Sequence, residues 1–234
     1  RSRPLKILIV GPSWVGDMVM AQSLFITLKQ LHPHCEIDVL APTWSGALLD
    51  HMPEINRLVE MTVGHGELGL GKRRALARSL KQTGYDQAIV LPNSFKSALI
   101  PWLAGIPKRT GWRGEARGWL LNDCRTLDKK AYPLMVERFT TLANTEHAEL
   151  PDPLPRPVLS VSSEKREFVL NKLSLDTTKP VLAVCPGAEF GEAKKWPAQS
   201  YAVVAKNWLM AGGQVWILGS ANDNQDALRL KSSI

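Results

Sequence analysis

The segment GPSWVGDM, residues 11–18, carries a carboxylate where a phosphate-binding loop would carry a cation. Its two glycines, five residues apart between a strand-like run and a helix-like run, have P-loop spacing, but a P-loop continues with Lys and then Ser or Thr. Asp17 and Met18 take those two places. Because an aspartate repels phosphate, Asp17 either caps the following helix or acts as a general base on a substrate hydroxyl. Spacing alone favours the cap.

A second turn with charged side chains follows the strand-like run Val181–Cys185. It reads PGAEFGEAKKWP and places Lys194 and Lys195 just before a helix whose first residue is expected at Pro197. Helix-start amides and an ammonium group together suit a diphosphate, although surface lysines on a mobile loop are the alternative. The turn lacks GxGxxG and an acidic ribose partner, so a nicotinamide cofactor is poorly supported.

A third turn, PNSFKS, is followed closely by KRTGWRG, and together they hold Lys96, Arg109 and Arg113. The planar guanidinium of arginine suits phosphate or carboxylate recognition. The interleaved tryptophans are interpreted as core residues rather than as a platform for a sugar. The chain contains no HExxH, CxxC or EF-hand spacing, and its five histidines are dispersed, so no metal site is expected.

Composition narrows the class of protein. The hydrophobic content of 44% and charged content of 22% are ordinary for a soluble globular protein and exclude disorder. No apolar run approaches the ~18 residues of a membrane helix, the first residues show no signal peptide, and three scattered cysteines suggest reduced thiols in a cytoplasmic protein.

Positive charge is unevenly distributed along the chain. The net charge is +7, and residues 1–150 hold 19 Lys and Arg against 14 Asp and Glu. Such a surplus attracts anionic partners. One basic run consists of Lys72, Arg73, Arg74, Arg78 and Lys81, and its three arginines are interpreted as a solvated helix face. A second cluster lies in turns and is a candidate anion site: Lys96, Lys108, Arg109, Arg113 and Arg117.

Strand and helix patterns alternate, as expected for a parallel sheet with helices on both faces. The expected strands are 6–10, 36–41, 57–62, 87–91, 180–185 and 214–218. The expected helices are 18–31, 43–52, 72–82, a segment capped by Asn93 or Ser94 and ending near 103, 164–173 and 197–210, with a glycine-rich turn over 64–71. Residues 151–160 are rich in proline and predict an extended crossover between a first domain, 1–150, and a second, 161–234.

Four separated blocks carry a resemblance to a known family: KILIVGPSWVGDMVMAQSL, VLPNSFKSALIPWLAGIPKRTGWRGE, YPLMVERF and CPGAEFGEAKKWP. They resemble the bacterial ADP-heptose glycosyltransferases that build the inner core of lipopolysaccharide, in particular the type II heptosyltransferases. The resemblance implies an α/β, GT-B-like fold: two Rossmann-like, doubly wound domains with a cleft between them. The first would bind the acceptor, and the second, incomplete in this chain, the nucleotide sugar.

The resemblance also assigns roles to residues. Asp17 corresponds to the family's general base, and Lys194 to the lysine that faces the ADP diphosphate, with Lys195 and Gly187 beside it. Glu189 and Phe190 stand where the related heptosyltransferase I carries hydroxyl residues, so donor contacts at these two positions stay open. The expected acceptor-binding residues are Ser13, Trp14, Lys96, Arg109 and Arg113.

The implied reaction moves L-glycero-D-manno-heptose from ADP-heptose to the first heptose of Kdo-lipid A, with inversion and no obligatory metal. The implied partners are ADP-heptose, the heptosylated Kdo-lipid A acceptor and the cytoplasmic face of the inner membrane, contacted peripherally, with no nucleic acid. Family members continue with a donor-wrapping segment, so a polypeptide ending at Ile234 is expected to be inactive. The alternatives are a GT-B enzyme with another nucleotide sugar and a noncatalytic basic module, although no nucleic-acid motif is present.

Overall fold

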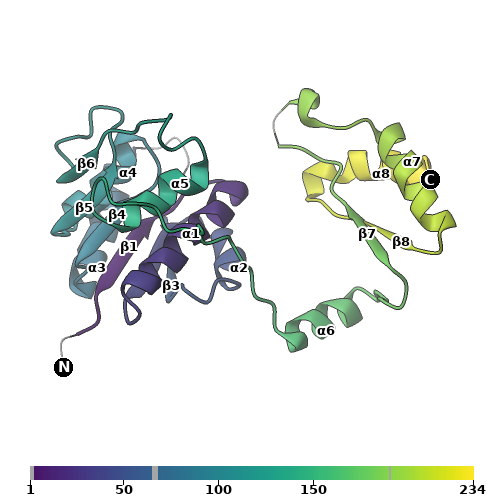
Figure 1. Cartoon of the computed structure of the whole chain (residues 1–234), viewed down its shortest axis with the longest axis horizontal. Helices are drawn as coiled ribbons and strands as arrows, with labels where there is room; N and C mark the ends of the chain where they lie inside the picture. The colour runs from purple at the N-terminus through teal and green to yellow at the C-terminus, as the bar shows by residue number, and fades with distance from the viewer. Residues whose placement is uncertain (1–2, 65–67, 190) are drawn as a thin grey trace. The chain divides into compact units, whose positions relative to one another are not determined.

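The computed structural model describes residues 3–64, 68–189 and 191–234. Within the expected glycine-rich turn 64–71, residues 65–67 lie outside the described residues, as does Phe190. The chain divides into two compact units, Arg1–Val161 and Ser162–Ile234 (Figure 1).

The first unit is built on a six-stranded parallel sheet in the order β3-β2-β1-β4-β5-β6. The strands are β1 (Lys6–Val10), β2 (Glu36–Ala41), β3 (Arg57–Glu60), β4 (Gln87–Val90), β5 (Lys108–Trp112) and β6 (Asp123–Arg125). The apolar runs of β1, β2 and β4 are buried on both faces, as parallel sheets require. The predicted parallel α/β architecture is therefore confirmed, and β5 and the short edge strand β6 are additions to the expected strands.

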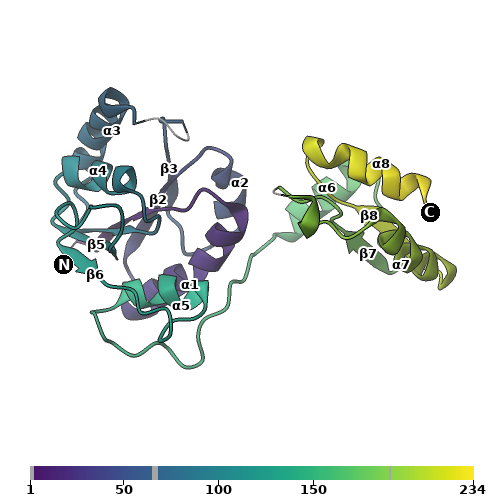
Figure 2. The same ribbon diagram turned by 90° about the horizontal axis from the view of Figure 1, so that it is seen from above.

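Helices cover both faces of this sheet. They are α1 (Val15–Leu31), α2 (Ser45–Leu49), α3 (Leu70–Thr83), α4 (Phe95–Leu103) and α5 (Met135–Thr140). Alternate residues of β1 enter two separate cores: Ile7 and Ile9 pack with α1 and α5, whereas Leu8 and Val10 pack with α3 and α4. Figure 2 shows α3 and α4 together on one side of the sheet and α1 and α5 on the other. Strand order reverses between β1 and β4, which is where open α/β sheets place their ligands.

The second unit has a two-stranded parallel sheet of β7 (Val181–Val184) and β8 (Gln214–Ile217). Its helices are α6 (Ser163–Lys172), α7 (Ala198–Met210) and α8 (Asn224–Ser232), with short 3-10 turns η2 (Glu192–Lys194) and η3 (Ala221–Asp223). Val184, Ala202 and Leu230 form its small core. Helix α7 begins at Ala198, so Pro197 occupies the cap position and not the first helical position that the sequence predicts.

The end of the proline-rich crossover is attached to the first unit. The buried amide of Gln22 donates to the carbonyl of Val158 at 2.7 Å and accepts from its N–H at 2.9 Å. The backbone of Ser160 pairs with His51 through the amide, which donates to the His51 carbonyl, and through the imidazole Nδ1, 2.8 Å from the Ser160 oxygen. Residues 158–160 thus belong to the first unit, and the connection to the second begins after them.

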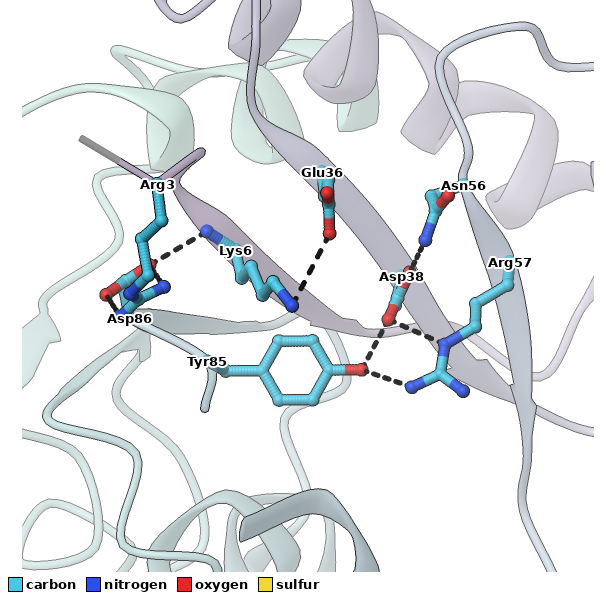
Figure 3. A network of polar contacts seen from close by, with 8 residues as sticks. All are labelled: Arg3, Lys6, Glu36, Asp38, Asn56, Arg57, Tyr85 and Asp86. Atoms are coloured by element: carbon cyan, nitrogen blue, oxygen red, sulfur yellow. Dashed lines mark hydrogen bonds and ion pairs between the residues drawn. The ribbon is translucent and has the colours of Figure 1, made fainter. Parts of the chain in front are cut away.

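A polar network closes the amino-terminal edge of the sheet (Figure 3). Asp38 is only 3% exposed and accepts hydrogen bonds from Tyr85 Oη at 2.5 Å, Arg57 Nε at 2.9 Å and Asn56 Nδ2 at 2.8 Å. Burial, followed by the bond to Asp38, raises the pKa of the Tyr85 hydroxyl. Because a buried carboxylate is tolerated only when it is hydrogen-bonded, these donors make the network a structural element, remote from the strands' carboxyl ends.

Candidate functional site

A cleft of about 940 Å³ lies at the carboxyl ends of β1, β2, β3 and β4. The turn after each strand contributes to it: residues 11–14 and 17 after β1, 41–44 after β2, 61–64 after β3, and 91–94, 96 and 97 after β4. Arg73 of α3 and Met135 and Phe139 of α5 complete the lining. The cleft therefore lies at the switch point that the strand order indicates.

Asp17 lies in the first turn of α1, because this helix begins at Val15, three residues earlier than the sequence predicts. The cap position belongs to Trp14, so the interpretation of Asp17 as the helix cap is wrong. The carboxylate is half-buried, lines the cleft and has no hydrogen-bond or ion-pair partner among residues 3–64, 68–189 and 191–234. The partial positive charge at a helix start favours an anion there. Asp17 therefore lies at a helix start and lines the cleft, where its carboxyl group can reach a ligand.

The opposite wall is the turn between β4 and α4, and a distant loop holds it in place. Ser94 occupies the cap position of α4 without a side-chain bond, and the Phe95 amide instead donates to Glu115 Oε2 at 2.8 Å. The prediction that Asn93 or Ser94 caps this helix is confirmed for Ser94, although the Ser94 side chain makes no capping bond. Glu115 reaches the helix from the loop after β5, where Gly114 is required because a Cβ would lie 2.6 Å from the Asn93 oxygen.

Arg117 of the same loop is fully buried and hydrogen-bonds to several residues of the turn between β4 and α4. Its Nη1 donates to Pro92 O at 2.5 Å, Ser94 O at 3.1 Å and Ser97 Oγ at 2.9 Å, and its Nη2 donates to Trp112 O at 2.7 Å. Burial lowers the pKa of this guanidinium. As a member of the second basic cluster, Arg117 was a candidate for anion binding, but its donors are directed at protein carbonyls.

Arg73 is a cleft residue that the sequence interpretation missed. Predicted to lie on a solvated helix face, it is 3% exposed, lines the cleft, and donates from Nε to Leu68 O at 2.6 Å and from Nη1 to Lys96 O at 3.3 Å. Burial lowers its pKa. The signal was present in the spacing, since Arg73, Ala77 and Leu80 stand at i, i+4 and i+7 and form the buried face of α3.

The expected acceptor residues divide into two groups. Ser13, Trp14 and Lys96 all line the cleft. Arg109 does not, because it is the second residue of β5, far from the carboxyl end, and its guanidinium donates to Leu120 O and Ile106 O, each at 2.7 Å. Arg113 is exposed just beyond the end of β5 and lines a separate shallow hollow.

The second unit presents the two lysines differently. Lys194 ends η2 and is exposed, with no ion-pair partner among the described residues. Lys195 forms ion pairs with Asp226 at 2.8 Å and Glu192 at 3.2 Å, which raise its pKa. A Cβ at Gly187 would lie 2.0 Å from Asp223 Oδ1, so close packing by itself requires this glycine.

Among the residues that the structure describes, no three His, Cys, Asp or Glu side chains gather into a set able to hold a metal ion. In the same residues, no helix has both the length and the apolar character needed to cross a bilayer.

Solved structures share this architecture. The structure of the E. coli ADP-heptose lps heptosyltransferase II superimposes with a TM-score of 0.91 at 48% identity, covering 98% of this chain and 69% of that one. E. coli heptosyltransferase WaaC with ADP-2-deoxy-2-fluoro heptose gives a TM-score of 0.70 at 18% identity, over 97% of this chain and 73% of that one, which shows a shared fold. The predicted GT-B-like α/β fold is confirmed.

Sequence relatives agree with the structural ones. Lipopolysaccharide heptosyltransferase 2 of Escherichia coli (strain K12) is 52% identical over 94% of this chain and 65% of its own length. Lipooligosaccharide heptosyltransferase 2 of Haemophilus influenzae is 47% identical with the same coverage. The chain thus spans slightly less than two thirds of these curated relatives. The pattern of glycosyltransferase family 9 (heptosyltransferase) matches residues 73–233, and the chain belongs to this family.

Proposed function

We propose that this protein is an inverting heptosyltransferase that moves L-glycero-D-manno-heptose from ADP-heptose to the first heptose of the Kdo-lipid A inner core. Family membership and the 52% identical E. coli relative support the transfer of heptose. The observation that carries the proposal is Asp17, a carboxylate without a protein partner among the described residues, in a cleft at the ligand-binding edge of the sheet.

In this reaction Asp17 takes the proton of an acceptor hydroxyl while the hydroxyl oxygen attacks the anomeric carbon of the donor. The bond between that carbon and the diphosphate oxygen breaks in the same step, and ADP leaves with the electron pair. A positioned general base typically contributes 10²–10⁴-fold to such a rate. The single displacement inverts the anomeric centre.

The first domain, 1–150, binds the acceptor in this proposal. Ser13 and Trp14 adjoin the base in the cleft, and Lys96 contributes a positive charge from the opposite wall. Arg113, exposed at the same sheet edge, would meet outlying phosphate or carboxylate groups of the acceptor. Because this acceptor is a lipid, the protein would work at the cytoplasmic face of the inner membrane through peripheral contact.

The second domain, 161–234, binds the donor in this proposal. Lys194 is the better candidate for the diphosphate, because Lys195 is already neutralised by Asp226 and Glu192. Gly187 contributes through its backbone beside Asp223. Removing a donor that faces a developing charge commonly costs about 10²–10³ in rate, so Lys194→Gln should lower turnover far more than Lys206→Gln, an exposed lysine of α7.

The test is release of ADP from ADP-heptose by the full-length protein, dependent on heptosylated Kdo-lipid A. Asp17→Asn should lower kcat at least 100-fold with little change in acceptor KM, whereas Asp50→Asn, an exposed carboxylate at the end of α2, should retain activity. Near-normal turnover by Asp17→Asn would refute the base. Faster turnover with another nucleotide sugar would identify a different donor, and anion binding without any turnover would support a noncatalytic module.

A further inference from the structure

Three aromatic side chains, partly buried Phe95 and exposed Trp102 and Trp119, form a cluster on the outer side of α4. Phe95 and Trp102 are seven residues apart on this helix and therefore share one face. Trp119, from the loop after β5, contacts both rings, with centroid separations of 6.0 Å to Phe95 and 5.5 Å to Trp102. Trp102 is 41% exposed and Trp119 is 61% exposed, so the interpretation of the interleaved tryptophans as core residues holds for buried Trp112 and is wrong for these two. Single exposed apolar residues are normal, but contiguous ones indicate a contact surface.

Basic residues flank this aromatic cluster on the neighbouring helix. Arg74, Arg78 and Lys81 of α3 are exposed, and α3 and α4 contain no acidic residue. The two helices lie side by side over the same face of the sheet (Figure 2). The two acids nearest in sequence to the aromatic cluster, Glu115 and Asp123, are both engaged. Glu115 accepts from the amide at the start of α4, and Asp123 accepts from Arg125 and Thr110. The outer surface of this layer therefore combines aromatic rings with uncompensated positive charge.

We propose that this aromatic–basic face, defined by Phe95, Trp102, Trp119, Arg74, Arg78 and Lys81, docks the protein on an anionic bilayer surface. Tryptophan is favoured at the membrane–water interface because its ring is apolar and its N–H is polar. Each Lys or Arg near an anionic leaflet strengthens binding about fivefold, or roughly 1 kcal/mol. An anionic bilayer surface therefore favours a protein face that combines exposed aromatic rings with basic helices free of acidic residues.

The position of this face relative to the cleft gives the docking a purpose. Arg73 of α3 and Lys96 of α4 line the cleft, whereas the other sides of the same two helices carry the proposed docking residues. A lipid-anchored acceptor would keep its chains in the bilayer while its head group enters the cleft. This purpose rests on the proposed function, but the docking itself does not.

Vesicle sedimentation with the full-length protein tests the docking. Vesicles of phosphatidylcholine with 30% phosphatidylglycerol should retain the protein at low salt, and pure phosphatidylcholine should retain it at least tenfold less. Trp102→Ser/Trp119→Ser and Arg74→Gln/Arg78→Gln should each weaken the partition at least tenfold. The matched controls lie in the second unit: Phe168→Ser, an exposed aromatic of α6, and Lys206→Gln/Lys231→Gln, an exposed basic pair.

The outcomes separate this surface from its rivals. Equal losses in the control variants, or retention by the phosphatidylcholine vesicles alone, would overturn the assignment. Tight binding to duplex DNA with no vesicle retention would reassign the face to nucleic acid. The vesicles contain neither sugar nucleotide nor acceptor, so failure of the heptosyltransferase assay leaves this result unaffected. If both proposals hold, the double variants should keep their turnover on a de-acylated soluble acceptor and lose it on a vesicle-embedded one.

Discussion

Replacement of Arg117 by methionine should loosen the wall of the cleft that faces Asp17. The guanidinium donates to three carbonyl oxygens and one hydroxyl, from Pro92, Ser94, Trp112 and Ser97. In the variant, Ser97 Oγ still donates to Ser94 O at 2.6 Å and, at a longer 3.3 Å, to Pro92 O. The carbonyl of Trp112 loses the guanidinium and the carbonyl of Pro92 loses its shorter bond. Loss of the main donor of a buried acceptor costs about 1–3 kcal/mol, which predicts a loss of about 2–6 kcal/mol for the two.

Urea unfolding measures this loss directly. With an m-value of about 1–3 kcal/mol/M, a loss of that size lowers the urea midpoint for unfolding of the first unit by about 2 M. Hydrogen exchange at the amides of β4 reports the unfolding of this unit. Arg113→Met is the matched control, because this exposed side chain has no partner among the described residues, and its effect should stay within about 0.5 kcal/mol.

Arg117→Lys separates charge from geometry. Lysine restores the positive charge but has one nitrogen in place of a planar fork, so it can reach only part of the set of acceptors. We expect it to recover no more than half of the lost stability. If Arg117→Met unfolds at the same urea concentration as Arg113→Met, the buried guanidinium does not hold the turn between β4 and α4, and the reasoning fails.

Three further predictions concern other parts of the first unit. Gln22→Leu removes both hydrogen bonds to Val158, so the Val158 amide should exchange at least tenfold faster by mass spectrometry while the sheet amides keep their protection. Tyr85→Phe deletes a donor to buried Asp38 and should lower the free energy of unfolding by about 1.5–3 kcal/mol in urea at pH 7. Asp86 has a lowered pKa, chiefly because it accepts the backbone amide of the first residue of β1. The contribution of Asp86 to the free energy of unfolding is therefore complete above its pKa in the unfolded chain, near 3.9, and is lost as pH falls through its lower pKa in the folded protein. The difference in stability between wild type and Asp86→Asn should thus narrow from pH 5 toward pH 2.

The strands and their parallel pairing were predictable because they depend on local pattern. β1, β2 and β4 are mostly apolar, and strands buried on both faces favour such runs. Asp38 of β2 is the buried exception, and the polar network described above satisfies it. Strand β6 was not predictable in the same way, since two of its three residues are charged. Arg125 is accommodated there by Asp123 and by the carbonyls of Thr141 and Asn144, which follow it by 16 and 19 residues.

The sequence predicted those cleft residues that directly follow the carboxyl end of a strand, where open α/β sheets place their ligands. It did not predict the others. Ser13, Trp14, Asp17 and Lys96 follow β1 and β4 directly, so topology alone brings them to one edge. The start of α1 was predicted too late, because Gly16 and Asp17 have low helix propensity. Tertiary packing outweighs that preference, since Met18 is fully buried between the sheet and the helix layer.

Arginine roles were the least predictable feature, and they alter how the positive charge of this protein acts. Arg117 donates to carbonyl and hydroxyl oxygens, none of them anionic, yet a guanidinium keeps its proton even where burial lowers its pKa. Its charge therefore persists in a low-dielectric environment behind the cleft wall, where solvent screens it less than it screens an exposed residue. A buried arginine can thus raise the potential of the cleft and attract an anionic ligand without touching it. Counting basic residues in the sequence gives the sign of this field, but only the burial of each guanidinium separates the arginines that contact an anion from those that attract it at a distance.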